Sequence, residues 1–151
     1  MKPFLSPALL IACAAALVAA RPAPVSNQYT VTVDNGPHAG KYAAKAEDIQ
    51  CIHSKGQKIL FATFSTLDAH TGNSGVQSGI RVYDPDAPGA KTGELSAEFG
   101  TFVNRTAKYV ITKIPITLTI SGKGADIVGA GKTADGVEVH VSASCANVLQ
   151  M

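Results

Sequence analysis

Apolar and polar residues alternate with a period of two along most of this chain, and that pattern strongly restricts how the chain can fold. Successive side chains of a β-strand point to opposite faces, so such runs predict strands with one buried and one exposed face. Clusters of Gly, Pro, Asn and Asp separate the runs and are typical of tight turns. The sequence therefore predicts an all-β domain.

The runs are short and regularly spaced. Those before residue 116 lie at 29–33, around 51, and at 59–64, 76–83, 94–99 and 109–111. Residues 41–48 suit a short helix by composition, but we expect an extended segment because Gly40 and a strand flank them. About eight strands with turns every 8–12 residues indicate a sandwich or a barrel, and we favour an antiparallel two-sheet β-sandwich over residues 29–151.

The last third has the clearest pattern. Runs at 116–120, 125–129 and 137–145 are separated by Gly-rich and Asp-Gly turns, which predicts a three-stranded antiparallel meander. In the last run, Val137, Val139, Val141, Ala143 and Cys145 share one face and should point into the core. The segment 129–133 resembles the end of a P-loop, but Asp126 stands where the motif needs glycine, so we interpret it as a turn.

The first twenty residues are typical of a secretory signal. Lys2 precedes an apolar run, and small residues lead to a predicted cleavage near Ala20. The run is too short for a bilayer span, so we expect none in the mature chain. Residues 21–28 should form a flexible N-terminal segment. We expect a secreted or periplasmic protein, with lipid anchoring at Cys13 as the alternative because residues 10–13 resemble a lipobox.

Cleavage near Ala20 would leave two cysteines, Cys51 and Cys145. An even count in an exported protein is expected for one disulfide. Two buried free thiols are the alternative, and a zinc site lacks the usual paired cysteines.

Composition argues against several functions. The formal net charge is +2 and Trp is absent, so neither the basic excess nor the aromatic face of a nucleic-acid-binding protein is present. There is no GxSxG motif, and Glu94 and Glu98 are predicted to lie on a solvated strand face. The four histidines form no HxH or HExxH motif. We predict no catalytic residues, no metal site and no cofactor.

Three loops are candidates for binding, at residues 34–40, 68–75 and 83–93. The middle loop is the most polar, and its candidate binding residues are Asp68, His70, Thr71, Asn73 and Ser74. An alternative is a small secreted hydrolase in which His70 is the base and Asp68 orients it.

The layout of the mature chain is similar in plan to the mycobacterial lipoprotein-antigen family. The matching stretches are Val31-Thr-Val33-Asp34-Asn35-Gly36, Cys51, Val76-Gln-Ser78 and the run from Val137 to Cys145. The resemblance implies an immunoglobulin-like sandwich with a Cys51–Cys145 bridge at the cell envelope, and it supplies no catalytic residues.

The sequence thus predicts an exported, monomeric, non-catalytic binding or envelope-interaction module. Its partner would be an envelope protein, a glycan or a small ligand. A carrier that holds a small apolar ligand between the sheets is a further alternative.

Overall fold

The protein is built almost entirely from β-strands. A computed structural model describes residues 26–67 and 70–151. In these ranges the elements are β1 (Gln28–Val33), β2 (Gly40–Ala43), the 3₁₀ helix η1 (Ala46–Asp48), β3 (Ile49–Ser54), β4 (Ile59–Ser65), β5 (Gly75–Tyr83), β6 (Gly89–Gly100), β7 (Arg105–Ser121), β8 (Gly124–Lys132), β9 (Glu138–Cys145) and β10 (Leu149–Gln150). No helix in these two ranges has the length and apolar character needed to span a membrane.

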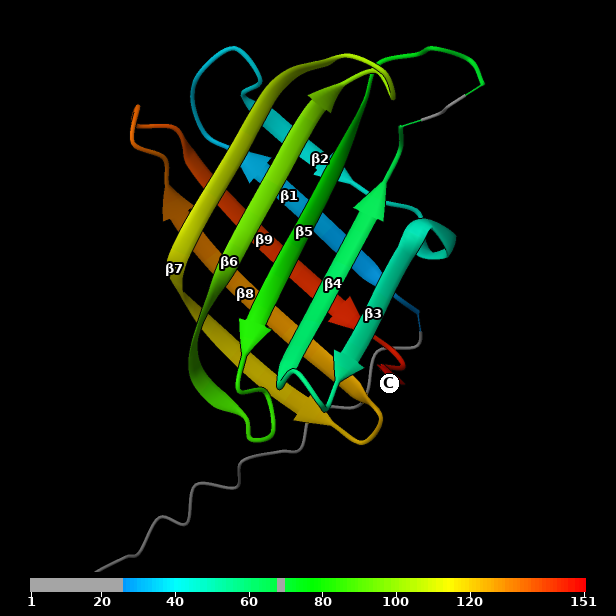
Figure 1. The fold of residues 1–151 in the computed structure, drawn as a ribbon, viewed down its shortest axis with the longest axis vertical. Helices are drawn as coiled ribbons and strands as arrows, with labels where there is room; N and C mark the ends of the chain where they lie inside the picture. Colours follow the sequence, from blue (N-terminus) through cyan, green and yellow to red (C-terminus); the bar gives the residue numbers. More distant parts are fainter. Residues whose placement is uncertain (1–25, 68–69) are drawn as a thin grey trace, which may run out of the picture.

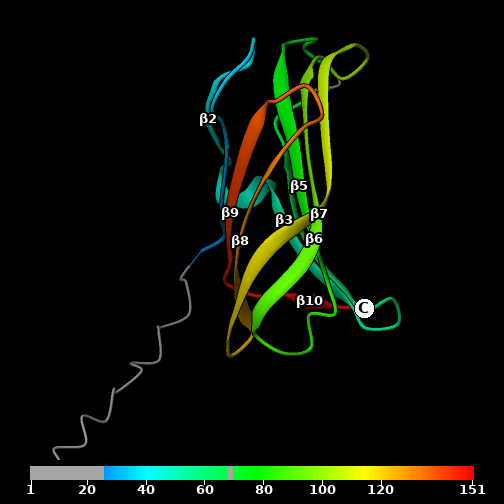
Figure 2. The same cartoon turned by 90° about the vertical axis from the view of Figure 1, so that its left-hand side faces the viewer.

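All the strands belong to one hydrogen-bonded sheet with the order β10-β3-β4-β5-β6-β7-β8-β9-β1-β2. Neighbouring strands are antiparallel, except that the short β10 pairs in parallel with β3. The sheet curls so that β3 to β6 lie in front of β1, β9 and β8 (Figure 1). Seen from the side, β6 and β7 pass from one layer into the other (Figure 2).

A bulge in β7 accompanies this bend. Gly93 pairs with Ile114 and Glu94 pairs with Thr112, so Lys113 is an extra residue with φ of 57°. A bulge bends its strand and increases the local twist. It also shifts the alternation by one residue, so that Ile111 and Ile114 are both buried. β7 can therefore face the core in both layers.

The core lies between the two layers and contains a disulfide that joins them. Tyr29 of β1 and Phe64 of β4 pack in its centre with their ring centroids 4.9 Å apart. Cys51 of β3 and Cys145 of β9 form the disulfide, with a Cα–Cα distance of 6.1 Å. These strands are far apart in the sheet order, so the bond connects the two layers directly.

The structure confirms the all-β class, the disulfide and the C-terminal meander. It differs from the expected eight-strand sandwich, because the described residues form ten strands in one continuous curled sheet. The predicted runs at 109–111 and 116–120 are parts of the single strand β7. The bulge explains why one strand gives two separate runs in the sequence, because it interrupts the alternation without ending the strand.

Two local predictions also need correction. Residues 129–132 belong to β8 and are not a turn. Gly129 and Gly131 leave room for isoleucine side chains of β5 and β7. The segment 41–48 is only partly extended, because η1 occupies Ala46–Asp48. The strand expected at 29–33 begins one residue earlier, at Gln28.

Candidate functional site

A cleft opens between the two layers at one end of the domain, the lower end in Figure 1. The cleft is lined by residues from the end of β3, the start of β4, the loop after β5, the turn between β7 and β8, and the C-terminal segment with β10. Its volume is about 430 Å³, within the range of small-ligand sites.

Local sequence explains how these segments form the cleft. Gly122 has φ of 59°, which suits a glycine in the tight turn between β7 and β8. The backbone N–H of Val148 donates a hydrogen bond of 2.8 Å to the carbonyl of Lys123 in this turn. On the other side, Met151 donates to the carbonyl of His53 at 2.9 Å. The C-terminal segment is thus held between the two layers.

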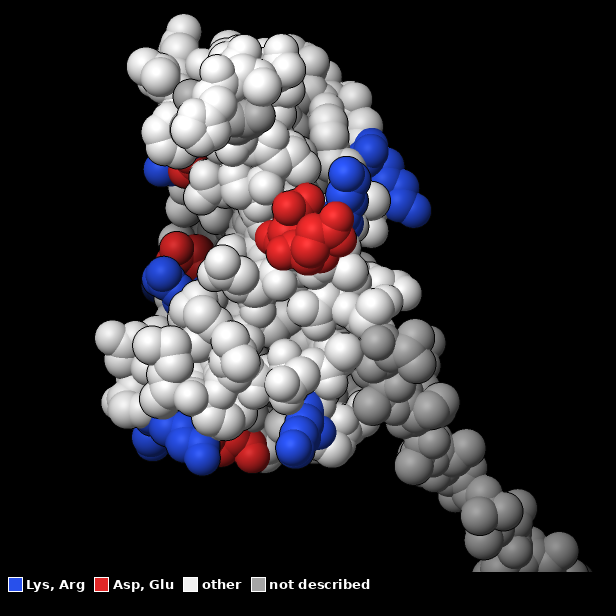
Figure 3. Space-filling model, turned by 90° about the vertical axis from the view of Figure 1, so that its right-hand side faces the viewer, with Lys and Arg blue, Asp and Glu red and all other residues white. Residues whose placement is uncertain are grey.

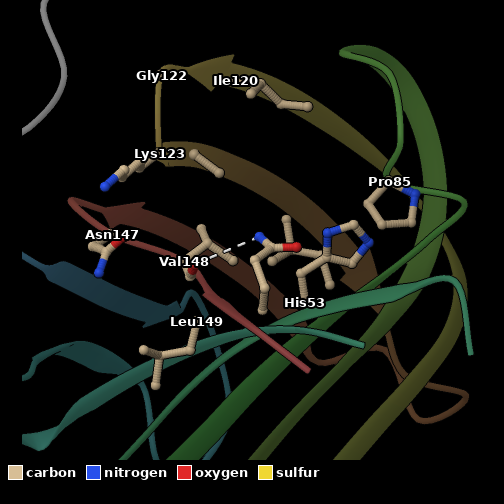
Figure 4. Close-up of a pocket in the computed structure, with 12 residues that line it drawn as sticks. His53, Pro85, Ile120, Gly122, Lys123, Asn147, Val148 and Leu149 are labelled. Atoms are coloured by element: carbon tan, nitrogen blue, oxygen red, sulfur yellow. Dashed lines mark hydrogen bonds between the residues drawn. The ribbon is translucent and has the colours of Figure 1, made fainter. Parts of the chain in front are cut away.

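The cleft walls are largely apolar. Leu60, Pro85 and Ala125 are buried, while Ile120 and Leu149 lie at the opening with 41% and 57% of their surface exposed. Figure 4 shows His53 and Pro85 on one side of the cleft and Ile120 and Lys123 on the other. Apolar walls with few polar groups suit a small ligand that is itself mainly apolar.

Four polar side chains line the cleft: His53, Lys123, Asn147 and Gln150. The His53 side chain is 14% exposed, and its Nε2 is inaccessible to solvent with no hydrogen-bond partner. The nearest carboxylate oxygen is Oδ1 of Asp86, at 3.6 Å, which is an ion-pair distance but too long for a hydrogen bond. The imidazole ring still lines the cleft, so its accessible edge can contact a ligand there.

The predicted binding loop lies at the other end of the domain, between β4 and β5. Asp68 is outside the described residues. His70, Thr71, Asn73 and Ser74 are exposed, and the N–H of Asn73 donates to Thr71 Oγ1 at 3.4 Å. Of these residues, Ser74 lines a cavity of about 350 Å³.

That cavity has an aromatic wall. The His38 ring stacks on Phe99 with centroids 4.6 Å apart, and Tyr42 meets the same ring edge-on at 5.0 Å. The loops at 34–40 and 68–75 both contribute to this end.

The third predicted loop, at residues 83–93, lies at the end of the domain that contains the cleft. It is shorter than expected, because β6 begins at Gly89.

Charged side chains on the strand faces are mostly paired. The Glu98 carboxylate forms ion pairs with Lys108, whose Nζ lies 2.9 Å from Oε1, and with Arg105, whose Nε lies 3.3 Å from Oε2. The hydrogen bond from Lys108 is the main reason that the pKa of Glu98 is lowered. Glu94 lies 3.8 Å from Arg81 and accepts a hydrogen bond from Tyr83. Both carboxylates are on the outer face, as predicted. Figure 3 shows only small groups of both signs on the face that it presents.

Inside the core, burial raises the pKa of the Tyr29 hydroxyl, which bonds to Ser78 Oγ at 3.1 Å. Ser78 in turn donates to the carbonyl of Ser96 at 2.8 Å. This buried pair is a structural link between the layers.

The cleft has no recognisable signature in the sequence. Its lining comes from five separate stretches, and the residues 147–150 carry no strand pattern or motif. The exposed apolar residues Ile120 and Leu149 were the available signal, but their exposure is known only from the fold. Comparisons with known protein families, curated proteins and solved structures give no match to this chain.

Proposed function

We propose that this protein is an exported, non-catalytic binding domain that takes a small, mainly apolar ligand in the cleft at the β3–β10 end. The observation that carries the proposal is the 430 Å³ cleft, whose walls are more apolar than polar and include the His53 imidazole. The apolar walls would remove the ligand's surface from water, and the imidazole would contact one polar group.

Export is supported by residues 1–20, which have the pattern of a signal peptide, and by the buried disulfide. The intact mass of the protein from its own host, before and after reduction, tests this part. A chain that starts at Arg21 and gains two hydrogens supports a soluble exported domain. A chain that starts at a lipidated Cys13 supports an envelope anchor, and retention of residues 1–20 would contradict cleavage.

Ligand binding is tested with the neutral apolar dye 1-N-phenylnaphthylamine. The dye should bind saturably, with a fluorescence increase. Ile120→Asp places a charge at the cleft opening, where the parent side chain is 41% exposed, so the fold should tolerate it. Because a charge in an apolar site is unfavourable, this variant should bind at least tenfold more weakly.

Val110→Asp is the matched control. Val110 lies on the same strand, is 47% exposed and does not line the cleft. The control should bind the dye like the parent. Equal binding by the Ile120 variant, or equal loss in both variants, would contradict the cleft as the binding site.

A further inference from the structure

A second group of reactive side chains lies at the opposite end of the domain, where β1 ends and β9 begins (Figure 1). Glu138 and His140 are two residues apart on β9, so both project from its outer face. Asp34 directly follows β1, and its N–H donates a hydrogen bond of 2.9 Å to the carbonyl of Glu138. Two neighbouring strands thus bring one imidazole and two carboxylates together.

The spacing of these groups suits a metal ion. Nε2 of His140 lies 2.8 Å from Oδ2 of Asp34, and one ligand atom from each of the three residues lies within 4.8 Å of the others. Bonds of roughly 2.0–2.2 Å to zinc place tetrahedral ligand atoms roughly 3.3 Å apart. Only small side-chain rotations are needed to reach that distance.

Asn35 fixes the backbone beside this group. Its side-chain nitrogen donates to the carbonyl of Gly136 at 3.0 Å, and its Oδ1 accepts from the N–H of Glu138 at 2.9 Å. These bonds tie the segment after β1 to the start of β9. Side chains carried by a fixed backbone lose little conformational entropy when they bind an ion.

Glu138 also contacts a cation. Nζ of Lys132 lies 2.6 Å from Oε1 of Glu138, and this hydrogen bond is the main cause of the lowered pKa of Glu138. An ion would therefore share this carboxylate with Lys132 and use its second oxygen.

An open groove adjoins the imidazole. His140 lines a hollow of about 440 Å³ on the outer face, together with Thr30, Thr32 and Ser142. Three protein ligands beside open space are typical of zinc sites in which water or a further ligand completes the coordination.

We propose that Asp34, Glu138 and His140 bind one divalent transition-metal ion of the Zn²⁺ class, with an open position toward the groove. One nitrogen and two oxygen donors match the ligand preferences of Zn²⁺. The metal site shares no residue with the cleft, so a negative result for ligand binding in the cleft would not contradict metal binding here.

Calorimetric titration of the full chain with zinc chloride tests the proposal, using protein without a polyhistidine tag and with the disulfide intact. One ion should bind per chain. His140→Ala and Asp34→Asn should each weaken binding at least tenfold. Both residues are exposed, so the variants should fold, which thermal unfolding without metal would verify.

The matched controls are His70→Ala and Glu47→Gln, which change an exposed histidine and an exposed carboxylate elsewhere. Both should bind zinc like the parent. Absence of saturable binding would overturn the proposal, as would unchanged binding in His140→Ala or an equal loss in the controls.

Discussion

Single polar side chains connect the two layers through the core. Tyr29 is 1% exposed, and its hydroxyl bonds to Ser78 of the opposite layer. Tyr29→Phe removes this bond, while Ser78 keeps its bond to Ser96. We expect the free energy of unfolding to fall by about 1–1.5 kcal/mol in urea titrations. The Tyr83 hydroxyl lies on the outer face, where the side chain is only half-buried. Tyr83→Phe should therefore lower the free energy of unfolding by less than about 0.5 kcal/mol. Equal losses would show that burial of the hydroxyl does not matter.

The pairing of Glu98 predicts how stability depends on pH. Its pKa is lowered in the folded protein, so the ion pairs with Lys108 and Arg105 stabilise the fold above the pKa of an unfolded Glu, about 4.3. This contribution is lost as the pH falls through the folded-state pKa.

Glu98→Gln should therefore lose about 0.5–1 kcal/mol at pH 7 and little at pH 2, and should show a weaker decline in stability on acidification. Urea titrations across this range measure both quantities. Glu47→Gln on η1 provides the exposed-carboxylate control. A loss at pH 2 as large as that at pH 7 would contradict an electrostatic origin.

At the scale of elements, the bend of β6 and β7 depends on close packing at Gly93. A Cβ there would collide with the carbonyl oxygen of Arg81 and with the Ile116 side chain. Because the carbonyl belongs to the paired strand β5, Gly93→Ala should cost more than about 2 kcal/mol.

Gly79→Ala is the matched control for this change. Gly79 is also in the sheet, but the nearest atom to its Cβ would be Ser96 Oγ at 3.5 Å, an ordinary contact. Thermal unfolding should show a large loss for the Gly93 variant and a small change for the Gly79 variant. Similar behaviour of the two variants would show that the bend adapts to an added methyl group.

At the scale of the whole molecule, the Cys51–Cys145 bond joins the two layers through cysteines that are 94 residues apart in the sequence. Constraint of so long a loop in the unfolded chain corresponds to about 4.5 kcal/mol. We expect Cys51→Ala/Cys145→Ala to lose up to this amount in urea titrations, and the reduced parent protein to lose a similar amount. A loss below about 1 kcal/mol would show that the continuous sheet alone holds the layers together.

The strand pattern, the paired cysteines and the C-terminal meander could be predicted from the sequence. Alternation records which side of a strand is buried, and both cysteines fell on buried positions. The bulge is also visible in the sequence, because the buried positions of β7 change phase between Ile111 and Ile114. From the sequence alone the shift predicts two separate strands, since a change of phase resembles a break in the pattern.

Local chemistry along the chain thus determined the all-β class, the strand candidates and the cysteines available for the disulfide. Tertiary structure decided the single curled sheet, the cleft and the meeting of Asp34 with His140, which are more than a hundred residues apart in sequence. The physical reason is that alternation specifies the buried face of a strand and leaves its neighbours undetermined. Sites formed between neighbours appear only when register and curvature are known.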